Sequence, residues 1–224
     1  MTEAEPQAGP QPETTGPPRR RWILIHPLVV RITHWINAFA IVCMVMSGWQ
    51  IYDASPIFNF VFPPWMTLGD WLGGGIAWHL AALWLLVVNG LVYISYGFAS
   101  GHFSRDFFPL SARQVLLDIR SALTFNLKHT PGVYNAVQKL LYVAVLLLGV
   151  LAVISGLTLW KPVQLPWFAW LLGGYPTARL IHFFAMSGIV GFVIIHVALV
   201  IIVPRTLPTM ITGRARLRPG EEIV

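Results

Sequence analysis

The sequence predicts an all-α fold: an integral membrane bundle of four helices. Of its 224 residues, 56% are hydrophobic and only 11% are charged, and the mean hydropathy is +0.66. Soluble domains carry about 25% charged residues. Four apolar stretches each approach the ~20 residues that cross the hydrocarbon core of a bilayer. Within lipid each stretch is expected to be helical, because a helix satisfies its own backbone hydrogen bonds.

The four predicted spans divide the chain into a domain and two tails. They cover about residues 32–52, 74–96, 137–160 and 179–203. Residues 1–21 contain five prolines among polar residues and predict a disordered tail. Residues 22–208 are expected to form the four-helix domain, and residues 209–224 a basic tail.

The basic residues predict the orientation of the bundle. Thirteen of the 15 lie before or at the start of span one, between spans two and three or just inside span three, or after span four. Only Lys161 and Arg179 remain for the opposite face. The positive-inside rule therefore places both termini in the cytoplasm of a multi-pass protein of the bacterial inner membrane. The net charge of +6 thus indicates topology and contact with membrane lipids, and no nucleic-acid partner is expected.

Four of the seven histidines lie within the predicted spans, namely His34, His79, His182 and His196. Polar groups are costly in lipid and mark functional or paired positions. His182 and His196 are 14 residues apart, which brings them within about 40° of one helical face and about 21 Å apart along the axis. That separation is too large for one metal ion and suits two cofactors.

The depths of these histidines predict two pairs. His34 and His196 lie toward the cytoplasmic ends of their spans, whereas His79 and His182 lie toward the outer ends. Each pair can supply two neutral imidazoles to the axial positions of one haem iron. The single Cys43 excludes covalent c-type attachment and a cysteine-ligated cluster. Two b-type haems between the helices are therefore predicted.

Alternatives to haem ligation are hydrogen-bonded core histidines, a proton relay and a metal transporter. The last two would more often add an intramembrane carboxylate, and no Asp or Glu lies inside any predicted span. Four histidines in two pairs of matched depth favour haem.

Three further residues are candidates for haem contacts. Gly48 follows His34 by 14 residues, on the same helical face and at the depth of the other haem, where a flat macrocycle needs room. Close packing between helices is an equally simple explanation of this glycine. Arg31 and Arg179 each precede a candidate ligand by three residues and share its face. Either arginine could bind a haem propionate or anchor a lipid phosphate.

Similar dipeptides occur in span one and in or just before span three. Asn37-Ala38 and Ser47-Gly48 mark the first, and Asn135-Ala136 and Ser155-Gly156 mark the third. The repeat indicates two related helix hairpins, although coincidence explains so few positions equally well.

Several motifs together resemble the bacterial cytochrome b561 and nickel–iron hydrogenase cytochrome b subunit family. Formate dehydrogenase gamma subunits and thiosulfate-reductase-type cytochromes b are similar. The motifs are His26-Pro27-Leu28, Arg31, Thr33-His34-Trp35, Asn37-Ala38, Ser47-Gly48, Trp78-His79, Tyr134-Asn135-Ala136, Gln138-Lys139 and the pair His182 and His196.

The resemblance implies a dihaem unit that links a periplasmic redox enzyme, such as a molybdenum oxidoreductase or a hydrogenase, to the quinone pool. It also implies that Asn135 and Gln138, with Lys139 nearby, lie beside the cytoplasmic haem and bind quinone. A helix N-cap is an equally simple explanation of Asn135.

The expected function is electron transfer as the membrane subunit of an oxidoreductase, and whether the chain is itself an enzyme stays open. One alternative is a stand-alone superoxide-to-quinone oxidoreductase of the cytochrome b561 type. A second alternative is a non-redox membrane transporter or scaffold.

Overall fold

The computed structural model describes residues 22–101, 136–204 and 207–216. The predicted tail of residues 1–21, the end of the C-terminal tail and Asn135 lie outside the described residues.

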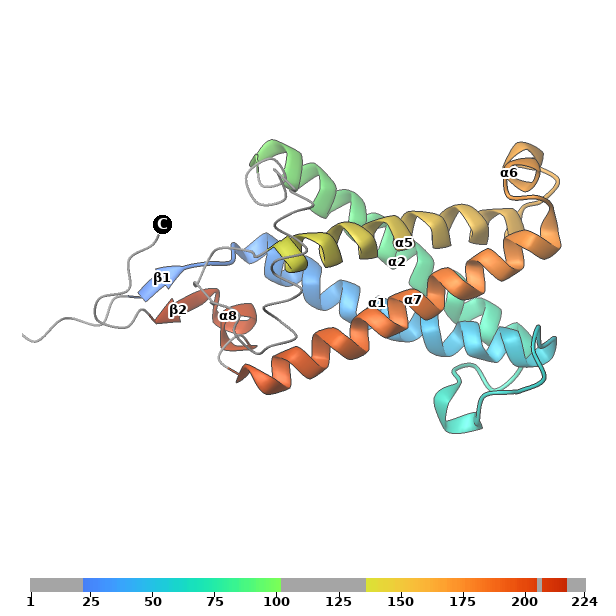
Figure 1. The fold of residues 1–224 in the computed structure, drawn as a ribbon, viewed down its shortest axis with the longest axis horizontal. Coiled ribbons are helices and arrows are strands. Elements are labelled where there is room, and N and C mark those ends of the chain that lie inside the picture. Colours follow the sequence, from blue (N-terminus) through green and yellow to red (C-terminus); the bar gives the residue numbers. More distant parts are fainter. Residues whose placement is uncertain (1–21, 102–135, 205–206, 217–224) are drawn as a thin grey trace, which may run out of the picture.

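Four long helices form the body of the protein (Figure 1). They are α1 (Leu28–Ala54), α2 (Leu72–Ala99), α5 (Ala136–Trp160) and α7 (Tyr175–Ile202). Each is long and apolar enough to cross a membrane. The prediction of an all-α membrane bundle of four helices is therefore confirmed.

The helices extend beyond the apolar runs that predicted them. The fourth begins at Tyr175, four residues before the predicted span, and has Pro176 in its first turn. Proline is well accommodated there because its missing N–H has no partner in the helix. The preceding Gly174, with φ 89°, turns the chain into the helix.

Short elements lie at the two ends of the bundle (Figure 1). The end that carries β1 (Trp22–Leu24), α8 (Leu207–Thr212) and β2 (Arg214–Arg216) is called the terminal end. The opposite end carries η1 (Pro64–Met66) and α6 (Pro166–Leu171) and is called the loop end. The two loop-end segments are the proline- and tryptophan-rich connections between the long helices.

A small cap closes the terminal end. The strands β1 and β2 pair antiparallel, with Trp22 opposite Arg216. Two side chains of α1 donate to the end of α8: Arg31 Nη1 to the Ile211 carbonyl at 2.9 Å and Trp35 Nε1 to the Met210 carbonyl at 3.2 Å. Residues 209–216, assigned to a tail from the sequence, thus pack against the start of α1.

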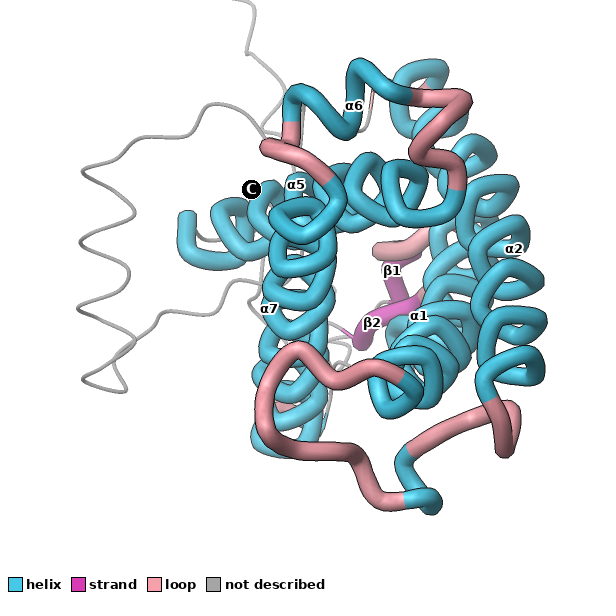
Figure 2. The backbone as a smooth tube through the Cα atoms, turned by 90° about the vertical axis from the view of Figure 1, so that its right-hand side faces the viewer, coloured by secondary structure: helices cyan, strands magenta, loops and turns pink. Residues whose placement is uncertain are grey.

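The bundle consists of two helix hairpins. Figure 2 shows α1 beside α2 and α5 beside α7, and the close packing within the described residues follows these two pairs. Between the hairpins the described backbones approach only at isolated points. The buried apolar residues are mostly small, namely Ala40, Cys43, Ala82, Ala178 and Ala185 beside Tyr52. The large ones, such as Trp84 and Ile201, face outward, as lipid-exposed helices require.

Candidate functional site

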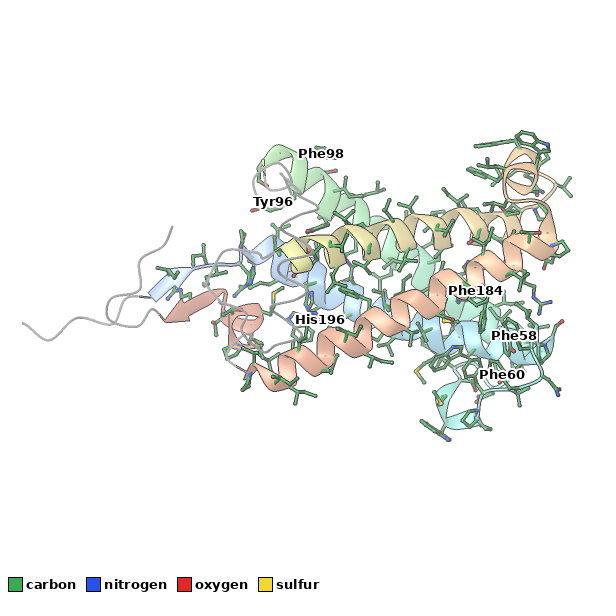
Figure 3. All side chains as sticks on the ribbon, viewed as in Figure 1. Phe58, Phe60, Tyr96, Phe98, Phe184 and His196 are labelled. Atoms are coloured by element: carbon green, nitrogen blue, oxygen red, sulfur yellow. The ribbon has the colours of Figure 1, made fainter. Side chains whose placement is uncertain are left out.

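Two pairs of histidine rings face each other across the two hairpins. His34 on α1 and His196 on α7 have ring centroids 6.1 Å apart, toward the terminal end. His79 on α2 and His182 on α7 have centroids 6.3 Å apart, toward the loop end. Figure 3 labels His196 on the terminal half of α7. These are the pairs that depth along the helices predicts.

The spacing of each pair suits two axial ligands of one metal ion. Two metal–nitrogen bonds of about 2.0–2.1 Å plus the ring radii put opposed imidazole centroids roughly 6–6.5 Å apart. Among the described residues no group of three or more His, Cys, Asp or Glu could hold a metal ion. A haem macrocycle would supply four coordination positions besides the two imidazoles of each pair. The residues present fit a haem at each pair.

At the loop end, hydrogen bonds determine the tautomer of His182. Its Nδ1 lies 2.9 Å from the Ala152 carbonyl and 3.1 Å from Ser155 Oγ, both on α5. A carbonyl oxygen only accepts, so Nδ1 carries the proton. The lone pair of Nε2 is then free to bind a metal.

His79 is held in the same way from α1. Ser47 Oγ lies 3.1 Å from its Nδ1. The hydroxyl proton of Ser47 is directed at the Cys43 carbonyl, 2.5 Å away, so the serine accepts and His79 donates. The Ser-Gly repeat in the sequence thus corresponds to two equivalent contacts, each from the first helix of a hairpin to a histidine of the second.

The glycine of each dipeptide gives the ring its space. A Cβ on Gly48 would lie 3.4 Å from His79 Cε1, and a Cβ on Gly156 would lie 3.1 Å from His182 Cε1. The second distance is shorter than ordinary van der Waals contact. The observed neighbour of Gly48 is therefore an imidazole, and its contact with a macrocycle stays a prediction.

The two arginines bind backbone carbonyls. Arg31 donates to Ile211 in the terminal cap, and its Nε is buried without a hydrogen-bond partner in the described part of the chain. Arg179 at the start of α7 donates to the carbonyl of Ser55, the C-cap residue that follows α1. Both contacts hold elements together, and binding of propionate by either arginine stays a prediction.

Comparison with known proteins identifies the family. The model of prokaryotic cytochrome b561 matches residues 25–213. The chain belongs to this family. It is thus a multi-pass membrane electron-transfer protein of the b-haem class.

Three relatives illustrate the range of the family. A putative protein-methionine-sulfoxide reductase subunit, YedZ1 of Azospira oryzae, is 50% identical over 84% of this chain and 96% of its own. The cytochrome b556(fdo) subunit of formate dehydrogenase from Escherichia coli K12 is 25% identical over 87% of this chain and 86% of its own. A probable Ni/Fe-hydrogenase B-type cytochrome subunit of Bradyrhizobium diazoefficiens is 25% identical over 80% of this chain and 77% of its own.

The residues expected at a quinone site lie at the edge of the described structure. Gln138 and Lys139 belong to the first turn of α5, and the structure does not describe their side chains. Since Asn135 also lies outside the described residues, a quinone site in this b561 cytochrome stays a prediction.

Asn89 is a polar residue that the sequence analysis did not identify. It lies on α2 with only 6% of its surface exposed. Its Nδ2 donates to the Thr33 carbonyl at 2.8 Å and to Asn37 Oδ1 at 2.7 Å, which joins α2 to α1 beside His34. The sequence does contain a signal that could have identified Asn89: it is a single amide within an apolar span, and polar groups in lipid require partners.

An aromatic cluster lies at the loop end, next to the second histidine pair. Tyr52 and Phe58 both contact Phe183, the neighbour of His182, at centroid distances of 5.4 and 5.3 Å. Phe58 also contacts Phe60 and Phe184, whose side chains reach the surface (Figure 3). This apolar, aromatic cluster therefore reaches the residue of α7 that follows His182.

Proposed function

We propose that this chain is a dihaem b-type cytochrome that carries electrons across the inner membrane between quinone and a periplasmic redox enzyme. One observation carries the proposal: two imidazole pairs, with centroids 6.1 and 6.3 Å apart, lie in opposite halves of α7. Four helices of membrane-spanning length surround them.

In this proposal His34 and His196 hold one haem, and His79 and His182 hold the other. Bound haem supplies reversible one-electron chemistry at iron. The four histidines that would hold the haems lie at two depths, about 21 Å apart along α7, and are surrounded by apolar helices. Haems held at these two depths would have edges closer together than this, within reach of electron tunnelling.

The orientation follows from charge. Basic residues cluster around the terminal end in the sequence, so the proposal places that end, both termini and the pair His34 and His196 at the cytoplasmic face. The pair His79 and His182 then lies toward the periplasm. Residues 22–208 make up the dihaem domain, and residues 209–216 cap its cytoplasmic end.

The partner is proposed to be a periplasmic reductase of protein methionine sulfoxide. Support comes from the 50% identical relative, whose name describes a subunit of such a reductase. Reduction of a sulfoxide to a thioether and water consumes two electrons and two protons. Quinol oxidised near Gln138 and Lys139 would supply the electrons, which then pass singly to the periplasmic side.

Haem content tests the ligand assignment. Purified protein should contain two b haems per chain in a pyridine haemochrome assay, and His79→Ala or His196→Ala should each remove about one. The control is His102→Ala, because His102 lies outside the predicted spans. Colourless protein would support the transporter or scaffold, and a single haem would refute the pairing.

Reconstitution tests the direction and the partner. Vesicles that contain the cytochrome and its reductase subunit should reduce protein methionine sulfoxide with added quinol, and the Gln138→Ala variant should be slower. If the isolated chain instead passes electrons rapidly from superoxide to quinone and needs no second subunit, the stand-alone oxidoreductase is correct and the proposed partner is wrong.

A further inference from the structure

Two buried serines make the same contact at the loop end. Ser47 and Ser155 are both fully buried, and each lies 3.1 Å from the Nδ1 atom of a histidine on the neighbouring helix. Each directs its own proton at the carbonyl four residues earlier, at 2.5 Å for Cys43 and 2.6 Å for Leu151. The oxygen of each serine is therefore oriented as an acceptor for imidazole.

Within the described residues, the terminal-end histidines are held differently. In the part of the chain that the structure describes, neither His34 nor His196 has a hydrogen bond to its ring. Their contacts are aromatic: His34 meets Trp35 edge-on at 5.3 Å, and His196 stacks on Phe192 at 5.9 Å. The two pairs thus differ in what holds the rings, although their spacing is alike.

We propose that Ser47 and Ser155 are positioning residues for the loop-end haem: each gives an Nδ1–H a second acceptor beside a backbone carbonyl, that of Met44 for His79 and that of Ala152 for His182, and so fixes the orientation of the ring. The planes of His79 and His182 cross at 69°, and those of His34 and His196 cross at 58°. This inference rests on the proposed haem ligation and adds to it an asymmetry between the two sites.

The expected consequence is electronic as well as geometric. An imidazole that donates its second N–H to an oxygen is a more basic metal ligand, and such partners also fix the orientation of the ring. A more basic ligand stabilises ferric over ferrous iron, so the two serines lower the midpoint potential of the loop-end haem. The angle between the ligand planes sets the anisotropy of the low-spin ferric EPR signal, which gives a second, independent measurement.

The experiment compares redox titrations and low-temperature EPR spectra of the purified dihaem protein. The variants are Ser47→Ala, Ser155→Ala and the double variant. Ser187→Ala is the matched control, because Ser187 on α7 makes the same bond to a carbonyl four residues earlier, at 2.8 Å from Phe183, without a contact to histidine. Ser47→Cys keeps the size of the side chain and weakens the acceptor.

We expect one of the two redox transitions to move to higher potential in each alanine variant, and further in the double variant. One EPR signal should shift with it, while the other transition and signal stay in place. Ser47→Cys should move the same transition by a smaller amount, and Ser187→Ala should leave both in place.

Three outcomes would overturn the inference. In the first, both transitions and both signals are unchanged in the double variant with two haems retained. In the second, Ser47→Cys matches the wild type while Ser47→Ala does not, which would mean that shape matters and the acceptor does not. In the third, both transitions move equally. Wild-type protein without two b haems would instead refute the proposed function, so the two failures are distinguishable.

The number of haems bound by each variant distinguishes a loss of cofactor from a shift in potential. If Ser47→Ala loses one haem with unchanged helical circular dichroism, and Ser47→Cys retains both with a raised potential, the positioning role is supported. If Ser47→Cys loses the same haem, the residue serves packing and the inference fails.

Discussion

Asn89 on α2 donates a hydrogen bond of 2.8 Å to the backbone carbonyl of Thr33, the residue before the candidate ligand His34. The same amide nitrogen donates to Asn37 Oδ1 at 2.7 Å. A single buried side chain thus ties α2 to the turn of α1 that carries a histidine. The ligand helix is held by a polar contact where the surrounding packing is apolar.

Replacement of Asn89 with leucine should weaken the first hairpin. Hydrogen bonds between membrane helices contribute about 0.6 kcal/mol on average and up to about 1.7 kcal/mol, so we expect a loss of about 1 kcal/mol. Reversible unfolding in mixed micelles measures it.

A double-mutant cycle with Asn37→Ala isolates the contact between the two amides. We expect a coupling energy of about 0.6 kcal/mol. Strictly additive effects would show that Asn89 acts through the Thr33 carbonyl alone.

Gly156→Ala should disturb the loop-end haem more than Gly48→Ala. The added Cβ would lie 3.1 Å from the His182 ring in the first case and 3.4 Å from the His79 ring in the second. We expect reduced haem content, or an altered EPR signal, chiefly for Gly156→Ala. Gly149→Ala is the control on the same helix, because a Cβ there meets nothing within 4 Å. Equal effects at Gly149 and Gly156 would attribute the change to α5 as a whole.

Gly213→Ala should loosen the terminal cap. Gly213 has φ 78°, and an added Cβ would lie 2.8 Å from the His26 carbonyl oxygen. A non-glycine residue in the left-handed region costs about 1–2 kcal/mol before any clash is counted. Limited proteolysis of membranes should therefore cut residues 207–216 faster in this variant. Gly191→Ala is the control, because a Cβ there has open space around it, and this variant should be cut at the wild-type rate. If the Gly213→Ala variant is cut no faster than the wild type, the cap tolerates the change and the prediction is wrong.

Fusions test the orientation of the bundle. We expect green fluorescent protein fused after Val224 to fluoresce, because that end is placed in the cytoplasm. Alkaline phosphatase inserted after Gly173, in the loop between α6 and α7, should be active in the periplasm. The reverse pattern of reporter activity would show that the bundle has the opposite orientation, with the pair His34 and His196 toward the periplasm.

The long helices and the histidine pairs were predictable because both depend on local sequence. A run of about 20 apolar residues must be helical in lipid whatever it packs against. Once a span is helical, its rise per residue determines the depth of His182 and His196, and depth alone matches them with His79 and His34. Family membership was likewise predictable from short motifs spread over the helices.

The terminal cap was not predictable in this way. Residues 207–216 form elements of a few residues each, and such elements are stable only through their partners. Here the partners are Arg31 and Trp35, 180 and 175 residues away in sequence. Composition alone therefore assigned residues 209–224 to a basic tail.

By itself the sequence determined that four helices cross the membrane and that two histidine pairs lie at different depths, because hydropathy and helical rise act along the chain. Only the tertiary structure decided what holds each histidine. Ser47 and Ser155 are ordinary residues of their helices until α1 packs on α2 and α5 on α7. That packing brings each serine to a ring 32 and 27 residues away, and an interaction between helices exists only once their faces are in register.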